Sequence, residues 1–315
     1  MEKINSTFLM TNQPEYFNHF WDYMKGHEGE ECYLEAGKKD SASYVLPTLT
    51  SKKFSEKLAS ESLFRTLATC LYSRGSTPTI KARMNNDSAT WVAEGGSIPV
   101  YDGMDDFTDY MLSNHKLAVV LKLDMDFLHD NSYIFESYFL DRLVKDFARA
   151  EEDGFINGNG TSEPAGLLHA TKGAEVGVTA ESLSFDTVID LFFSLDPEYR
   201  KRAAWIMNDN TALALRKLTD ENGNHLWNHT NDTILGKPVI ISNFMPDAEN
   251  GAKPILFGDF SYYWIVDRTP LIVRTLREKF FEAQQIGYLA NERLDGRLIR
   301  PDAVKVLKIE QSEEE

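Results

Sequence analysis

The strongest hydrophobic pattern in the chain is an apolar stripe at helical spacing between residues 132 and 155. Phe135, Phe139, Leu143 and Phe147 recur at every fourth position, and charged residues occupy much of the remaining surface. The polar run Asp130–Ser132 can cap the first turn, and glycines at 154, 158 and 160 can end the last one. The pattern predicts one helix which, at about 1.5 Å per residue, extends roughly 35 Å.

Weaker periodicities predict the other elements. Apolar residues near the helical period predict helices over 14–24, 51–71, 183–194 and 209–218. Alternating or continuous apolar runs predict strands over 79–84, 90–93, 117–123, 203–207, 238–241, 253–257, 271–276, 281–289 and 303–309. Strands on both sides of a polar tip at 94–109 favour a projecting hairpin, and proteins usually cover or use such exposed edges.

The first 42 residues have the pattern of an arm. Phe17, Phe20, Trp21 and Met24 lie on one side of the helix predicted over 14–24, and a polar, acidic stretch follows. We expect that stretch to be mobile. The alternative is an ordinary N-terminal helix that packs on the body of the chain, and the pattern favours neither interpretation.

Composition narrows the class of protein. Of the 315 residues 42% are hydrophobic, enough for one large core or two modest ones, and 12% are aromatic, which excludes a chain disordered by composition. No window approaches the roughly 18–20 apolar residues of a membrane span, and from the residues at the start of the sequence we expect no secretory signal. Cys32 and Cys70 are expected to be free thiols in a reducing compartment.

The formal net charge of −16 constrains the partners. Binding to nucleic acid through a broad basic face is excluded, because phosphate binding needs clustered Lys and Arg. Copies of the chain repel one another. Any assembly must therefore rest on apolar or locally complementary contacts.

Few residues offer chemistry. The run Asn157–Thr161 lacks the Gly-Lys-Ser/Thr ending of a phosphate-binding loop, and a helix-ending turn explains it better. His225 and His229 lack a third metal ligand. The acidic runs at 105–106, 124–126 and 151–153 lack the ligand order of a Ca²⁺ loop and are interpreted as solvated faces. We expect no catalytic residue, no metal and no cofactor.

Short motifs in order along the chain carry a family resemblance. They are Ala89–Gly95 with Ile98–Pro99, Lys116–Ala118, Asp130–Ser132, Glu151–Asp153, Asn157–Gly160, Pro164–Leu168, Trp205–Asn208, Asp220–Gly223, Leu235–Val239, Phe257–Phe260 with Tyr263 and Asp267–Arg268, Glu292–Gly296 and Pro301–Ala303. Together they resemble the major capsid proteins of tailed phages, which have the Hong Kong 97 fold, over about Ser43–Leu307.

The resemblance implies an α+β fold with a defined division of the chain. The expected parts are an N-terminal arm (1–50), the entry helix and strand of a peripheral domain (51–86), an extended β-hairpin or E-loop (87–123), a long spine helix with more of the peripheral domain (124–170), an axial α/β domain (171–265), peripheral-domain strands (266–309) and an acidic tail (310–315). In the family the arm and E-loop lie across adjacent subunits. Their apolar surface is therefore expected to be buried only on assembly.

The resemblance further implies a structural subunit and not an enzyme. It would assemble as pentamers and hexamers into the icosahedral head of a phage or prophage, around double-stranded DNA that it binds without sequence specificity. Implied partners are copies of itself, a scaffolding protein, a portal and a maturation protease, with no membrane. The implied location is the virion capsid, with the host cytoplasm during assembly. Only about 42 residues precede the matched region, so the scaffolding segment of many members is either replaced by a separate protein or shortened.

The family-like assembly positions are Trp91, Glu94, Gly95, Pro99, Phe107, Asp109, Gly158, Gly160, Gly236, Gly258, Arg293 and Asp295. Some family members join subunits by a Lys–Asn isopeptide bond that a Glu assists. Those three positions match Asp109, Gln284 and Asn291 here, and Lys116 matches a different position. The resemblance therefore predicts a shell without covalent crosslinking.

Two alternatives stay open. An encapsulin is a nanocompartment shell of the same fold that encloses a cargo enzyme, but the arm before Ser43 and the segment Pro164–Leu168 are more similar to phage members. The alternative from another class is a cytoplasmic α/β enzyme without a recognisable motif.

Overall fold

The computed structural model describes residues 9–27, 29–30, 34, 38–40, 43–73, 79–83, 89–98, 100, 107–129, 134–219, 227 and 232–310. The chain divides into two compact units. Unit 1 contains Met1–Ser73, Asn114–Thr171 and Ile265–Gly296, and unit 2 contains Arg74–Ser113, Lys172–Trp264 and Arg297–Glu315. Among the described residues, no helix is long and apolar enough to span a membrane.

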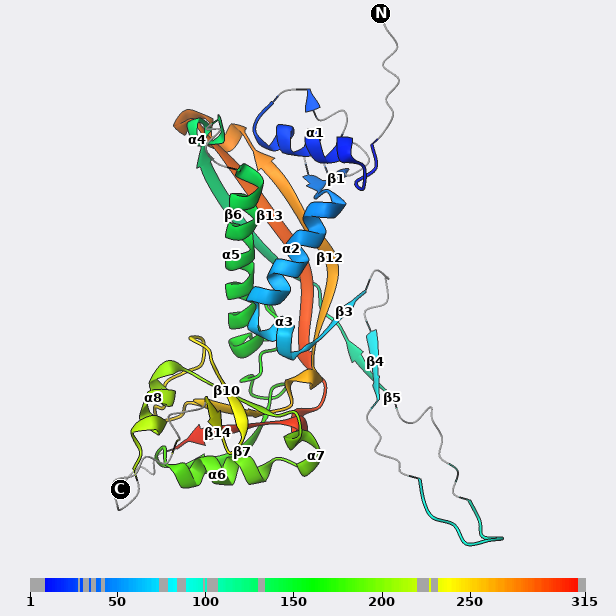
Figure 1. The fold of residues 1–315 in the computed structure, drawn as a ribbon, viewed down its shortest axis with the longest axis vertical. Helices are drawn as coiled ribbons and strands as arrows, with labels where there is room; N and C mark the ends of the chain where they lie inside the picture. The colour runs from blue at the N-terminus through cyan, green and yellow to red at the C-terminus, as the bar shows by residue number, and fades with distance from the viewer. Residues whose placement is uncertain are drawn as a thin grey trace, which may run out of the picture. The chain divides into compact units, whose positions relative to one another are not determined.

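Unit 1 is a sheet with helices packed against it (Figure 1). The strand order is β1-β2-β12-β13-β6, and β3 pairs with β12. The strands are β1 (Lys38–Asp40), β2 (Ser43–Val45), β3 (Thr69–Tyr72), β6 (His115–Asp124), β12 (Tyr263–Leu276) and β13 (Gln285–Leu298). The helices are α1 (Pro14–Met24), α2 (Thr48–Glu61), α3 (Leu63–Leu67), α4 (Met125–His129), α5 (Phe135–Asn157) and the 3₁₀ segment η4 (Glu278–Ala283).

The helix predicted from the long apolar stripe is α5, which has 23 residues. It ends at Gly158 as predicted, and a Cβ there would lie 2.2 Å from the carbonyl oxygens of Gly154 and Pro164, so only glycine fits this close turn. The predicted cap residues 130–132 lie outside the described residues, and the helix begins later than predicted. The N-cap residue is Ile134, whose side chain makes no capping hydrogen bond, and burial of Phe135 to 4% exposure positions the first turn instead.

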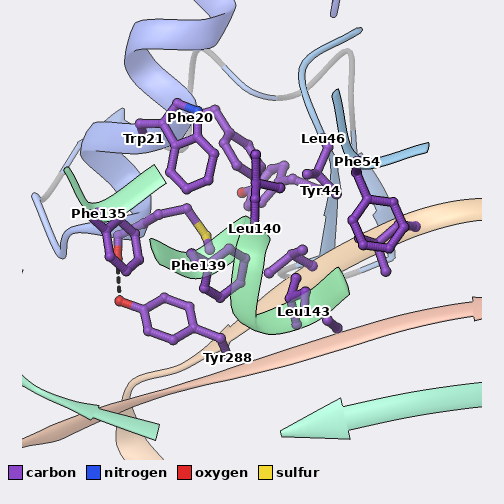
Figure 2. Packing of buried hydrophobic residues seen from close by; sticks show 14 of the residues in the cluster. Phe20, Trp21, Tyr44, Leu46, Phe54, Phe135, Phe139, Leu140, Leu143 and Tyr288 are labelled. Atoms are coloured by element: carbon purple, nitrogen blue, oxygen red, sulfur yellow. Dashed lines mark hydrogen bonds between the residues drawn. The ribbon is translucent and has the colours of Figure 1, made fainter. Parts of the chain in front are cut away.

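The core of unit 1 joins α1 to α5 and β13 (Figure 2). The ring of Trp21 packs edge-on against Phe135 and Phe139, at centroid distances of 5.7 and 6.1 Å. The hydroxyl of Tyr288 donates to the carbonyl of Met24 at 2.6 Å. The interpretation of 14–24 as a helix packed on the body is therefore confirmed. The expectation that the arm is buried only by neighbouring subunits is wrong for this helix, because its apolar face finds a matching stripe in its own chain.

Unit 2 is built on a mixed sheet of order β7-β14-β11-β8-β10-β9. Its elements are β4 (Thr79–Arg83), β5 (Phe107–Met111), β7 (Glu175–Ala180), α6 (Phe185–Ser194), α7 (Pro197–Arg200), β8 (Ala204–Met207), α8 (Asp209–Lys217), β9 (Thr233–Ile234), β10 (Lys237–Ile241), β11 (Ile255–Gly258), η3 (Phe260–Tyr262), η5 (Pro301–Ala303) and β14 (Val304–Ile309). Residues of α6 and α8 share a core with Trp205 and Phe257, whose rings stack at 4.0 Å. These helices and buried strands agree closely with the predicted ones.

The predicted hairpin is present in a different form. β4 and β5 pair antiparallel, from Thr79 opposite Met111 to Arg83 opposite Phe107. The strand predicted over 90–93 is absent. The strand predicted over 117–123 lies in β6 and has the expected alternating burial, but it pairs with β13 in unit 1 and not within the hairpin. Alternation shows that one face is buried without showing which strand is the neighbour, and here the apolar face joins the core of unit 1.

Two other predicted elements change type along their length. The helix predicted over 51–71 breaks at Ser62, whose side chain accepts from the backbone N–H of Arg65, and residues 69–72 form a strand instead. The strand predicted over 281–289 begins only at Gln285. Residues 278–283 form η4, and Gln284 turns the chain with a φ of 53°.

Candidate assembly surfaces

Among the described residues of unit 2, the three apolar side chains with the highest exposed fractions lie in one loop. We call residues 89–98 and 100, which follow β4 and precede β5, the exposed loop. Trp91 is fully exposed, Val100 is 93% exposed and Ile98 is 74% exposed. Large exposed apolar patches mark contact surfaces in soluble proteins, and three strongly exposed apolar side chains lie within ten residues of this loop. The exposed loop is therefore a candidate surface for binding another protein chain.

A tight turn shapes the middle of the exposed loop. The backbone N–H of Gly96 donates to the carbonyl of Ala93 at 2.8 Å, and Gly95 has a φ of 80°, which side chains rarely adopt. Glu94 and Gly95, two predicted assembly positions, form this turn, and Trp91 lies just before it. Pro99, a third predicted position, lies outside the described residues.

The root of the hairpin is anchored in unit 2. The hydroxyl of Tyr110 donates to the carbonyl of Ile299 at 2.9 Å, and the guanidinium of Arg297 lies 4.8 Å from the Tyr110 ring centre. Phe107 is 46% exposed on the strand that leads to this anchor. Asp109 is exposed too, and its carboxylate lies 3.6 Å from the ammonium of Lys81 across the hairpin. The two predicted positions on β5 thus present their side chains to solvent from a fixed base.

Predicted glycine positions have structural explanations inside the chain. Gly258 lies where β11 passes β14, and a Cβ there would approach the carbonyl oxygen of Ala303 to 2.4 Å. Gly160 and Gly236 have φ values of 67° and 74° in turns. Together with the helix-ending Gly158, these residues shape the backbone, and a direct role in contacts between subunits remains a prediction.

Arg293 and Asp295 lie on β13 of unit 1. A guanidinium N–H of Arg293 donates to the carbonyl of Asn114 at 3.3 Å, just before β6 begins. Asp295 is buried and accepts from the backbone N–H of Gly296 at 2.8 Å, and its Oδ1 lies 3.5 Å from Nε2 of His115. Both side chains stabilise the start of the β6–β13 pair. Their role in assembly stays a prediction.

The three crosslink positions differ in environment. Asp109 belongs to the hairpin of unit 2, whereas Gln284 and Asn291 belong to unit 1. Gln284 occupies the left-handed turn that enters β13, and Asn291 pairs with Ala118 of β6. Asp109 stands at the lysine position, Gln284 at the asparagine position and Asn291 at the glutamate position, so the prediction of a shell without crosslinks rests on residue identity.

The weak candidates for chemistry have ordinary explanations. The N–H groups of Gly158 and Gly160 donate to carbonyls of the chain, and Oδ1 of Asn159 accepts from Thr161 and Ser162, so the 157–161 turn uses its own donors. His225 and His229 lie outside the described residues. Within the described part of the chain, no group of three His, Cys, Asp or Glu side chains is placed to hold a metal ion.

A buried charge cluster in unit 1 was missed by the sequence analysis. It consists of Arg65 of α3, Glu151 of α5, Asp267 of β12 and Glu292 of β13. The side chain of Glu151 is fully buried, so the interpretation of 151–153 as a solvated face is wrong for its first residue. The available signal was that Glu151 lies in the apolar stripe of α5, four residues after Phe147. The sequence does not indicate that Arg65 pairs with residues 86 and 202 positions away.

Comparisons with known proteins agree with this architecture. The family model described as the phage capsid family matches residues 42–309. The capsid of a native GTA particle, solved with C5 symmetry, is 28% identical with a TM-score of 0.64 over 79% of this chain and 90% of that one.

Two other solved structures share the fold alone. The Microbacterium phage Oxtober96 structure is 16% identical with a TM-score of 0.56, over 78% of this chain and 90% of that one. The procapsid of satellite phage P4, which includes a size determination protein, is 10% identical with a TM-score of 0.56, over 83% and 99%. No curated protein matches the sequence. The expected capsid fold, with its mixed helices and sheets, is confirmed.

Proposed function

We propose, from the premise that this chain belongs to the phage capsid family, that it assembles as pentamers and hexamers into an icosahedral phage or prophage head around double-stranded DNA. The chain is a capsid shell subunit. The proposal adds the ring sizes, the enclosed genome and a purely structural role without catalysis. The alternative shell, an encapsulin with a cargo enzyme, differs in what the particles would contain.

The exposed loop carries this proposal. A buried Trp removes roughly 200 Å² from water, which corresponds to about 5 kcal/mol at ~25 cal per Å². That gain is available to Trp91 only when another chain covers it, since the side chain is fully exposed in the isolated subunit. Ordering the loop and docking the partner consume part of the gain. Each subunit contributes one such loop, so the stabilisation accumulates over a closed shell.

Net charge determines what the contacts must overcome. Copies carrying −16 each repel over the Debye length, about 8 Å at physiological salt. Apolar contacts through the exposed loop do not add to this repulsion. Head-to-tail contacts between identical chains close into rings when the rotation allows it, as the proposed pentamers and hexamers require.

The remaining parts of the proposal follow from the same family membership. The acidic chain encloses DNA without sequence-specific binding and without covalent crosslinks. A scaffolding protein, a portal and a maturation protease act with it, and assembly takes place in the host cytoplasm before the shell becomes part of the virion. The division into arm, E-loop, peripheral and axial domains is proposed on the same ground.

The test replaces the apolar side chains of the exposed loop. In the double variant Trp91→Ser, Ile98→Ser we expect a folded subunit that no longer forms shells under conditions where the wild-type chain does, as seen by negative-stain microscopy and light scattering. Leu49→Ser removes a 60% exposed side chain at the start of α2 and is the matched control. Normal shells from the double variant would show that the exposed loop does not make the contacts between subunits, and a wild-type chain that forms no shells would overturn the proposed function. Extraction of the particle contents, nucleic acid or a cargo enzyme, distinguishes a phage head from an encapsulin.

A further inference from the structure

The buried charge cluster opposes three carboxyl groups to one guanidinium. Nε of Arg65 donates to Glu151 at 2.8 Å, while Nη1 and Nη2 donate to Asp267 at 2.9 and 3.0 Å. Nη2 donates to Glu151 as well, at 2.5 Å. The side chain of Arg65 is only 7% exposed, so its guanidinium contacts these two carboxylates and little water. The single positive charge of the guanidinium is shared by both carboxylates, and Arg65 makes no hydrogen bond to the third acid.

That third acid is Glu292, and its surroundings oppose a negative charge. The residue is 6% exposed, and its Oε1 has no hydrogen-bond partner within the described part of the chain. Leu117, the residue directly opposite Glu292 in the β6–β13 pair, lines the same cavity as Glu151, which accepts from Arg65. Burying an ionised carboxylate without its own cation lowers the stability of the fold by several kcal/mol. When two carboxyl groups are adjacent, repulsion between their charges favours protonation of one of them.

Within the described residues, no second cation forms an ion pair with Glu292, although Lys116 of β6 lines the same cavity as Glu151. Beyond Arg65, Glu151 and Asp267, the neighbouring titratable groups are Cys70 and Tyr72 of β3. β6 places Leu117 directly opposite Glu292. His115, two residues earlier on β6, lies beside Asp295, 3.5 Å away, and so has its own acid.

We propose that Glu292 and Glu151 hold one proton between them, as a carboxylic acid that donates to a carboxylate, and that this proton is a latch that keeps the end of α5 on the sheet of unit 1. Four elements meet at the latch, namely α3, α5, β12 and β13. With the proton in place, the positive charge of Arg65 faces two negative charges, one on Asp267 and one on the Glu151–Glu292 pair. When the proton is lost, Glu292 and Glu151 both carry a negative charge in the interior. Their repulsion then opens the contact between α5 and β13.

The electrostatics of the pair agree with this geometry. Burial, followed by the charge of Glu151, raises the pKa of Glu292 well above its ordinary value of 4.5. Burial also raises the pKa of Glu151, against the hydrogen bonds and charge of Arg65. A cavity of about 190 Å³ lined by Glu151, Gly154 and Pro164 lies next to one member of the pair, Glu151. It is large enough for a few water molecules, each of about 30 Å³, and gives a path for proton exchange.

The raised pKa of Glu292 determines how the stability of the fold changes with pH. A carboxyl group whose pKa is higher in the folded state stabilises the fold fully below its unfolded pKa, and the stabilisation is lost as the pH rises through the folded pKa. The latch is therefore closed in mild acid and released in base. This is opposite to the acid denaturation that ion-paired carboxylates produce.

The first experiment follows the melting temperature of the full-length chain between about pH 6 and about pH 9. We expect the wild-type value to fall by several degrees over this range. In Glu292→Gln, which keeps a donor to Glu151 but cannot ionise, most of that fall should disappear. Glu61→Gln removes an exposed carboxylate of α2 in the same unit, away from the cavity, and should keep the wild-type slope. Equal slopes in wild type and Glu292→Gln would overturn the proposal.

A second measurement uses the wild-type chain alone, so it does not depend on whether a variant folds. Infrared spectra of the wild-type chain in D₂O should contain a carboxylic-acid band at neutral pH, which vanishes as the pH rises. Hydrogen exchange in the last turn of α5 and in β13 should accelerate over the same interval. A neutral-pH spectrum without the acid band would show that both carboxyl groups are ionised and that no latch exists. Neither measurement depends on shell assembly, so the latch and the proposed function can fail separately.

Discussion

Helix α1 and the exposed loop are both short segments in which a tryptophan stands among other large apolar residues, and they end in opposite environments. Trp21 is 6% exposed, held by the rings of Phe135 and Phe139, whereas Trp91 is fully exposed. The apolar residues of α1 recur at the helical period, so they form one face that fits the stripe of α5. The exposed loop has no such period. Apolar content therefore shows that a segment needs a partner, and only the fold shows whether that partner lies in the same chain.

The largest effect is expected at the α1 side of this comparison. Trp21→Ala leaves a cavity between α1 and α5, and removing a buried Trp costs about 3–5 kcal/mol. We expect the free energy of unfolding, measured by urea titration of the full-length subunit, to fall by that amount. A loss of less than about 1 kcal/mol would mean that α1 does not pack here in solution.

A smaller effect is expected at the hydrogen bond that joins α1 to β13. Tyr288→Phe removes the hydroxyl that donates to the carbonyl of Met24 and leaves that buried carbonyl without this donor. The expected loss is about 1–2 kcal/mol, measured in the same titration. Tyr138→Phe, which alters an exposed tyrosine of α5, is the matched control and should stay within about 0.5 kcal/mol of wild type.

The smallest effect on the subunit is expected at the other side of the comparison. Trp91→Ala removes a side chain that touches solvent, so the free energy of unfolding should change by less than about 0.5 kcal/mol. The yield of shells should nevertheless fall strongly, because the burial of Trp91 is gained only between chains. If Trp91→Ala lowered the free energy of unfolding as much as Trp21→Ala, Trp91 would belong to the core of its own chain. The difference between the two tryptophans would then be refuted.

Elements with a strong local signal could be predicted from the sequence. The stripe from Phe135 to Phe147 predicts α5, and the apolar run at 204–207 predicts the fully buried β8. Errors occur where a local signal is ambiguous. The alternation of Leu117, Val119 and Leu121 predicts a strand but not its partner, and the change from helix to strand near Ala68 has no marker in the pattern.

The predicted assembly positions divide in the same way. Gly158 could be singled out as a glycine that ends a helix, whereas Gly258 was named only through the family resemblance. Their physical reason, the close approach of carbonyl oxygens from Pro164 and Ala303, comes from the tertiary structure. Trp91 could be named only through the family resemblance, since nothing around it in the sequence separates an exposed tryptophan from a buried one.

By itself the sequence determined the local elements and the family to which their order belongs, because periodicity, turn residues and motif spacing act over a few residues at a time. Tertiary structure alone decided that α1 packs on its own chain, that β6 joins β13, and that Arg65, Glu151, Asp267 and Glu292 share one buried site. The reason is that burial and charge neutralisation depend on distances in space. Residues such as Arg65 and Asp267, 202 positions apart, acquire a common environment only when the chain has folded.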